Sequence, residues 1–86
     1  MKSSLISLMV DALSMMRAAG LSDFGTWPKD DAGLVLKAKA YAMVLEARGI
    51  DGVFIEKATA LCINSRSALP SAAEVAVICQ AVVDDE

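Results

Sequence analysis

The sequence predicts an all-α fold, a compact bundle of four helices with short connections, in one domain that spans residues 1–86. Three observations predict it. Apolar residues recur at spacings of three and four along most of the chain, which is the period of an amphipathic helix. No stretch shows the strict alternation of a half-buried strand or the Asn-Gly turn of a hairpin. Clusters of glycine, proline and serine divide the chain into four helical segments.

The first expected helix covers about residues 4–19 and ends at Gly20, a residue type that suits the left-handed position after a helix. Serines and Asp11 form a polar stripe along it. The opposite, apolar face is expected to enter the core, and consists of Leu5, Met9, Ala12, Leu13 and Met16. Leu8 and Met15 lie beside the polar stripe. These two residues either complete the edge of the core or contact a partner protein.

The second expected helix begins at residue 28 or 30, ends near residue 48, and is apolar on two sides. One stripe consists of Leu34, Ala38, Tyr41 and Leu45. The other stripe consists of Leu36, Ala40, Met43 and Ala47. Such a helix is either sandwiched between its neighbours or exposes one side to a partner. Leu36 and Met43 are therefore candidate partner-binding residues, and so is Trp27 in the preceding loop, which is expected to fold back onto the bundle.

The third helix is expected over about residues 51–64, and the fourth begins near Ser71. The expected buried face of the third helix consists of Phe54, Ile55, Ala58, Leu61 and Cys62. The fourth helix opens with the string "LPSAAEV", in which Pro70 blocks continuation of the helix before it. Ser71 and Glu74 have the spacing of a capping box. The expected buried stripe of the fourth helix consists of Val75, Ile78, Cys79 and Val82.

Composition narrows the class of function. The net charge is −3 with no basic block, so direct nucleic-acid binding is not expected, because phosphate contacts dominate such affinity. No stretch approaches the ~18–20 apolar residues of a membrane span, and no signal peptide is evident, so a cytoplasmic protein without membrane contact is expected. At 56% hydrophobic residues the chain carries more apolar side chains than one small core needs. Some apolar surface is expected to face a partner or a second copy.

Catalytic signatures are not found. The chain has no histidine, and its five scattered glycines fit no phosphate-binding loop. Cys62 and Cys79 lack the spacing of a metal site and are expected to be buried free thiols on neighbouring helices. We therefore expect no enzyme activity, no cofactor and no metal.

A tryptophan that leads into an alanine-rich helix, and a later Pro-Ser-x-x-Glu segment that opens another helix, form a pattern across about residues 5–80. Trp27 holds the first position, and the string from Leu69 to Val75 holds the second, with Leu69 in place of an aromatic residue. In this pattern the chain resembles small phage replication proteins of the helicase loader/inhibitor family. The resemblance implies an all-helical module, encoded by a phage, whose partner is a replication protein such as the hexameric replicative helicase.

The sequence thus predicts a non-enzymatic protein-binding module that acts in the cytoplasm of a bacterial host. Docking of an apolar helix face is the expected mechanism, with candidate contacts at Leu8, Met15, Trp27, Leu36 and Met43. Two alternatives stay open. One is a small phage inhibitor or anti-defence protein that blocks a different host protein. The other is a homodimeric structural protein whose second apolar stripe pairs with itself.

Overall fold

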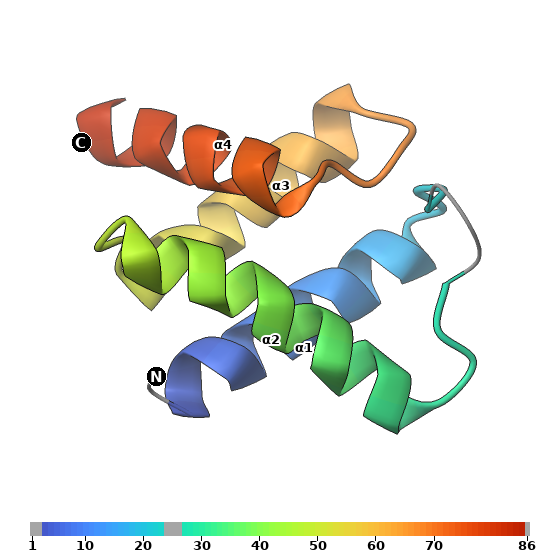
Figure 1. Ribbon diagram of the computed structural model, residues 1–86. Helices are drawn as coiled ribbons and strands as arrows, with labels where there is room; N and C mark the ends of the chain where they lie inside the picture. The colour runs from blue at the N-terminus through green and yellow to red at the C-terminus, as the bar shows by residue number, and fades with distance from the viewer. Residues whose placement is uncertain (1–2, 24–26, 86) are drawn as a thin grey trace.

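The computed structural model describes residues 3–23 and 27–85, and this part of the chain forms an all-α bundle as predicted (Figure 1). The elements are α1 (Ser3–Ala18), α2 (Asp31–Ala47), the short 3₁₀ helix η1 (Gly52–Phe54), α3 (Ile55–Ser65) and α4 (Ala72–Asp85). The predicted helices agree with these bounds to within a few residues, except that the third begins with the 3₁₀ turn. None of the described helices combines the length and hydropathy that crossing a bilayer requires.

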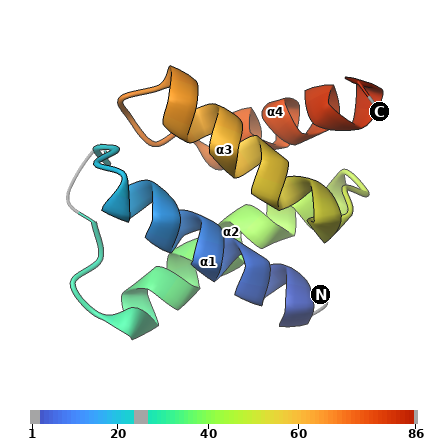
Figure 2. The ribbon, with the colours of Figure 1, turned by 180° about the vertical axis from the view of Figure 1, so that it is seen from behind.

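The four helices form two layers. Helices α2 and α4 face the viewer in Figure 1, and α1 and α3 face the viewer from the opposite side in Figure 2. Helix α1 packs against α2 and α3, and α4 packs against the same two helices. The shortest dimension of the molecule is 17 Å, which is about the thickness of two packed helices. Each helix therefore keeps an outer face that no described helix covers.

The core confirms most of the predicted buried faces. All five predicted core residues of α1 are buried, and the first stripe of α2 is buried together with Ala42. On α4, Val75, Cys79 and Val82 are buried and Ile78 is partly buried against the same cluster. Cys62 on α3 and Cys79 on α4 are buried free thiols on two helices that pack together, as expected.

The predicted face of α3 is wrong at one position and incomplete at another. Leu61 is exposed, whereas Thr59 is buried and takes its place in the core. The buried residues of α3 are Ile55, Ala58, Thr59 and Cys62, which have the regular spacing of one helix face, and Leu61 lies outside that face. Thr59 tolerates burial because its hydroxyl donates to the carbonyl of Ile55 at 2.7 Å.

Glycine and aspartate residues at the helix ends explain where the helices stop and start. Gly20 and Gly49 adopt φ values of 94° and 69°, the left-handed geometry that glycine provides after a helix. Asp30 caps α2, and its carboxylate accepts from the backbone N–H of Gly33 at 2.8 Å. The second helix therefore begins at Asp31, one residue after the later of the two predicted starts.

Replacing Gly33 with alanine is expected to destabilise the protein, although alanine is the better helix former. A Cβ atom at this position would lie 2.9 Å from Cβ of Pro28 and 3.0 Å from the capping oxygen of Asp30. The clash therefore offsets the propensity gain of about 1 kcal/mol and strains the cap. Thermal unfolding checks this, with Ala32→Gly on the exposed first turn as the propensity control. A more stable Gly33→Ala protein would show that the entry to α2 relaxes freely.

Two loops far apart in the sequence meet beside the bundle. The backbone N–H of Ser22 donates to the carbonyl of Ser67 at 3.1 Å, and the N–H of Leu69 donates to the carbonyl of Ser22 at 2.7 Å. Leu21 and Leu69 are buried beneath this contact. Trp27 packs against the core, and its Nε1–H donates to the carbonyl of Leu21 at 2.8 Å. We call this contact between residues 21–23 and 67–70 the loop junction.

The string that opens α4 belongs to this junction. Pro70 is buried, and its carbonyl accepts a 2.6 Å hydrogen bond from the hydroxyl of Tyr41 on α2. The backbone N–H of Glu74 donates to Oγ of Ser71 at 3.3 Å, which is half of the predicted capping box. The Glu74 carboxylate instead pairs with Arg66 at 3.1 Å. The string thus joins the end of α3, the start of α4 and the middle of α2.

Candidate protein-binding surfaces

Large apolar side chains remain exposed on the outer faces of the bundle. They are Leu8, Met15, Val35, Leu36, Met43, Val53, Leu61 and Val77. Single exposed apolar residues are common in soluble proteins, so only clusters indicate a binding site. Two clusters stand out: one lines a groove between α1 and η1, and the other follows the outer face of α2.

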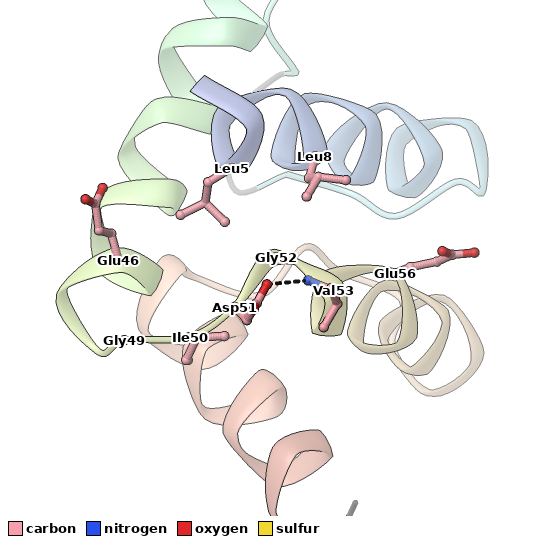
Figure 3. A pocket seen from close by; sticks show the side chains of 9 residues that line it. All are labelled: Leu5, Leu8, Glu46, Gly49, Ile50, Asp51, Gly52, Val53 and Glu56. Carbon is pink, nitrogen blue, oxygen red and sulfur yellow. Dashed lines mark hydrogen bonds between the residues drawn. The ribbon is translucent and has the colours of Figure 1, made fainter. Parts of the chain in front are cut away.

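The first cluster lines an open groove of about 500 Å³, which we call the α1–η1 groove (Figure 3). Leu5 and Leu8 of α1 form one wall, and the turn from Ile50 to Val53 forms the other. The complete lining consists of Leu5, Leu8, Glu46, Gly49, Ile50, Asp51, Gly52, Val53 and Glu56. Val53 is 72% exposed, so most of its side chain is available to a partner.

Gly52 sets the distance between the two walls. A Cβ atom on this residue would lie 2.6 Å from Cδ1 of Leu8 and 3.6 Å from Cδ1 of Leu5. Asp51 holds the turn, because its carboxylate accepts from the N–H of Val53 at 3.2 Å. The close approach of α1 to this glycine therefore fixes the turn that carries the exposed Val53.

The rim of the groove is acidic. Glu46 lies at one end, Glu56 lies at the other, and Asp51 stands between them in the wall (Figure 3). Among the described residues that line the groove, none is basic. An apolar floor with an acidic rim is complementary to an apolar side chain flanked by lysine or arginine.

The second cluster is the second apolar stripe of α2, which we call the outer α2 stripe: Leu36, Ala40, Met43 and Ala47. All four residues are exposed, and the exposed fractions of the two large ones are 70% for Leu36 and 56% for Met43. Within the described chain, α2 packs against α1 and α4 through its other side. The structure thus decides between the two predicted alternatives: α2 is not sandwiched, and its second stripe faces outward.

The five predicted contact residues do not form one site. Leu8 lines the groove, and Leu36 and Met43 lie on the outer α2 stripe. Met15 is exposed on α1 but is not part of the groove lining. Trp27 is half-buried beside the loop junction, where its ring packs against the core and its Nε1–H donates to the carbonyl of Leu21. Partner contact at Met15 and Trp27 stays a prediction.

Sequence reasoning did not single out Val53, Ile50 or Glu56 as binding residues. Val53 lies on the side of the third segment that the pattern indicates to be polar. The sequence feature that could indicate Val53 is the order Asp-Gly-Val, in which a branched residue directly follows a capping aspartate and a glycine. That signal gives no information about Leu8, which is 45 residues away in sequence.

Both cysteine thiols are buried in the structure. Burial raises the pKa of the Cys62 thiol, with a smaller opposing effect from Arg66. Burial, with a smaller effect of Cys62, raises the pKa of the Cys79 thiol to about 11. A thiol with a raised pKa holds little reactive thiolate at neutral pH. Three or more potential metal-ligating side chains do not gather anywhere in the described chain.

Comparisons with protein-family models, curated proteins and solved structures found no match to this chain. The resemblance to helicase loader/inhibitor proteins therefore stays a prediction that rests on Trp27 and the string from Leu69 to Val75. The assignment of a function depends on the groove and the outer α2 stripe.

Proposed function

We propose that this protein is a non-enzymatic protein-binding module whose α1–η1 groove takes an apolar side chain of a partner, flanked by basic residues. One observation carries the proposal: a groove with Leu8 on one wall and Val53 on the other, Glu46 and Glu56 at its two ends, and Asp51 in the wall between them. The shape is already present in the free chain, so binding needs little rearrangement of the backbone.

The groove is suited to a small number of strong contacts. Transfer of one partner leucine from water into such a site contributes roughly 1.5–3 kcal/mol. Binding energy in protein interfaces is concentrated in a few such anchors, surrounded by contacts that exclude water. Glu46, Asp51 and Glu56 add attraction for a basic partner, which mainly raises the association rate and excludes acidic competitors.

The identity of the partner within this proposal comes from the resemblance. On this resemblance, the module is encoded by a phage and acts in the bacterial cytoplasm. Its target is then a replication protein, such as the hexameric replicative helicase. A small inhibitor of a different host protein would use the same groove. The experiment below separates the two through the identity of the bound protein.

Substitution of Val53 with aspartate is expected to weaken partner capture at least about tenfold, because it places a charge among the apolar contacts. Val53 is 72% exposed, so the fold should tolerate the change. The measurement is affinity capture from bacterial lysates with quantitative mass spectrometry. Leu36→Asp, an equally exposed position on another face, is the matched control and should retain the groove partner.

The charge of the rim is tested separately with Glu56→Lys, which should reduce capture of the same partner and make it less sensitive to salt. Capture of a replicative helicase by the wild-type chain and its loss in Val53→Asp would support the complete proposal. Val53-dependent capture of another host protein would support the binding module and contradict the replication target. If no captured protein depends on Val53 or Glu56, the groove is not the binding site.

A further inference from the structure

We propose that the outer α2 stripe binds a second copy of this chain, with the two α2 helices antiparallel about a two-fold axis. The four residues of the stripe lie outside the groove lining, whereas Glu46 borders the stripe and also lies at one end of the groove. The proposal does not depend on the function proposed for the groove. The inference follows from three properties of the stripe: its spacing, its alternation of side-chain size, and the charges that border it.

The spacing is that of a helix–helix seam. Leu36, Ala40, Met43 and Ala47 follow one another at intervals of four, three and four residues. This is the a/d spacing that keeps a straight line of contacts along two packed helices. All four side chains are exposed and lie opposite the buried stripe of α2, so a second helix can approach them directly.

The order of large and small residues favours the antiparallel arrangement. In that arrangement Leu36 lies opposite Ala47 of the second copy, and Ala40 lies opposite Met43. Every layer then pairs one large side chain with one alanine, so the helices can approach closely and evenly. A parallel pair would set alanine against alanine and methionine against methionine, and would leave voids between the alanines.

The bordering charges are self-complementary under the same symmetry. Lys39 and Glu46 lie on one side of the stripe, seven residues apart. Antiparallel packing brings Lys39 of one copy towards Glu46 of the other, and the two-fold axis forms this pair twice. A parallel pair would instead place Lys39 beside Val44 of the second copy. Size and charge therefore select the same orientation independently.

The small surface area that this helix pair would bury indicates a weak dimer. A single-helix seam buries less than the roughly 800 Å² per partner of a standard stable interface. We expect self-association with a Kd on the order of 10–100 µM, so that the monomer predominates at low concentration.

Sedimentation equilibrium of the full chain over a concentration series tests the proposal. Wild type should dimerise, and Met43→Asp should raise the Kd at least about tenfold, because it buries a charge in the central layer. Val53→Asp, in the groove, is the control and should dimerise like wild type. Circular dichroism should show that each variant retains the helical content of wild type.

The orientation is tested by mixing two charge variants. Lys39→Glu and Glu46→Lys should each dimerise more weakly than wild type, because like charges then face each other. An equimolar mixture should form a heterodimer about tenfold tighter than either homodimer, since both pairs become attractive again. A monomer at all concentrations, or a dimer unaffected by Met43→Asp, would overturn the proposed site. A dimer that Met43→Asp weakens but that gains nothing on mixing would overturn the antiparallel arrangement.

Discussion

Replacing Leu45 with alanine is expected to lower the free energy of unfolding by about 2–5 kcal/mol. Leu45 is completely buried and lies on α2, a helix that packs against both α1 and α4. Loss of its side chain leaves a cavity that the rigid neighbouring helices cannot fill. A chain of 86 residues has a total stability of only about 4–13 kcal/mol, so this one change removes a large share of it. Urea unfolding followed by circular dichroism measures the effect.

The matched control is the same substitution on the same helix. Leu36 is 70% exposed, so Leu36→Ala should change the free energy of unfolding by no more than about 0.5 kcal/mol. Both variants have the same change in helix propensity, and only the burial differs. The experiment should use a low protein concentration, because a dimer through the outer α2 stripe would add apparent stability to wild type. Equal losses in the two variants would show that the outer stripe is part of the core.

The core could be predicted from the sequence where the helix is regular and its apolar stripe is narrow. On α1 the spacing of Leu5, Met9 and Met16 leaves a single face that can be buried, and that face is buried. On α2 the sequence contains two apolar stripes, and periodicity alone cannot rank them. The structure buries the stripe with Tyr41, whose hydroxyl donates to the carbonyl of Pro70 inside the bundle.

The errors on α3 and the missed groove have different physical causes. The buried face of α3 consists of Ile55, Ala58, Thr59 and Cys62, so Leu61 lies outside it. A local hydrogen bond to the carbonyl of Ile55 makes Thr59 compatible with the core. The groove depends on how closely Leu8 approaches Gly52, a contact between distant segments that no local spacing encodes.

Replacing Tyr41 with phenylalanine is the second change with a large expected effect, a loss of about 1–3 kcal/mol. The Tyr41 hydroxyl donates to the carbonyl of Pro70 at 2.6 Å in a buried position. Phenylalanine keeps the packing of the ring but leaves that carbonyl without its donor. Ser71→Ala, which removes an exposed capping contact of the same junction, is the control and should cost less, about 1 kcal/mol. The melting temperature of Tyr41→Phe should therefore be lower than that of Ser71→Ala in thermal unfolding.

The burial of the Tyr41 hydroxyl has a consequence at alkaline pH. Burial, aided by the negative charge of Asp23, raises the pKa of Tyr41 from 10.0 to about 12. The folded state thus holds the phenolic proton more tightly than the unfolded state. Its stabilising effect is complete below pH 10 and is lost as the pH rises towards 12, an effect of about 3 kcal/mol at most. The pKa values of the Cys62 and Cys79 thiols are also raised, that of Cys79 to about 11. Their ionisation therefore also lowers the stability of the folded state as the pH rises.

Absorbance titration can follow this ionisation directly, because Tyr41 is the one tyrosine in the sequence. Phenolate should form near pH 12 in the folded protein and near pH 10 in denaturant. Stability measured from pH 8 to 12 should fall more steeply in wild type than in Tyr41→Phe, whose remaining loss comes from the two thiols. Ionisation of the folded protein near pH 10, with equal pH profiles for the two proteins, would mean that the Tyr41 hydroxyl is open to solvent and not buried between α2 and the string that opens α4.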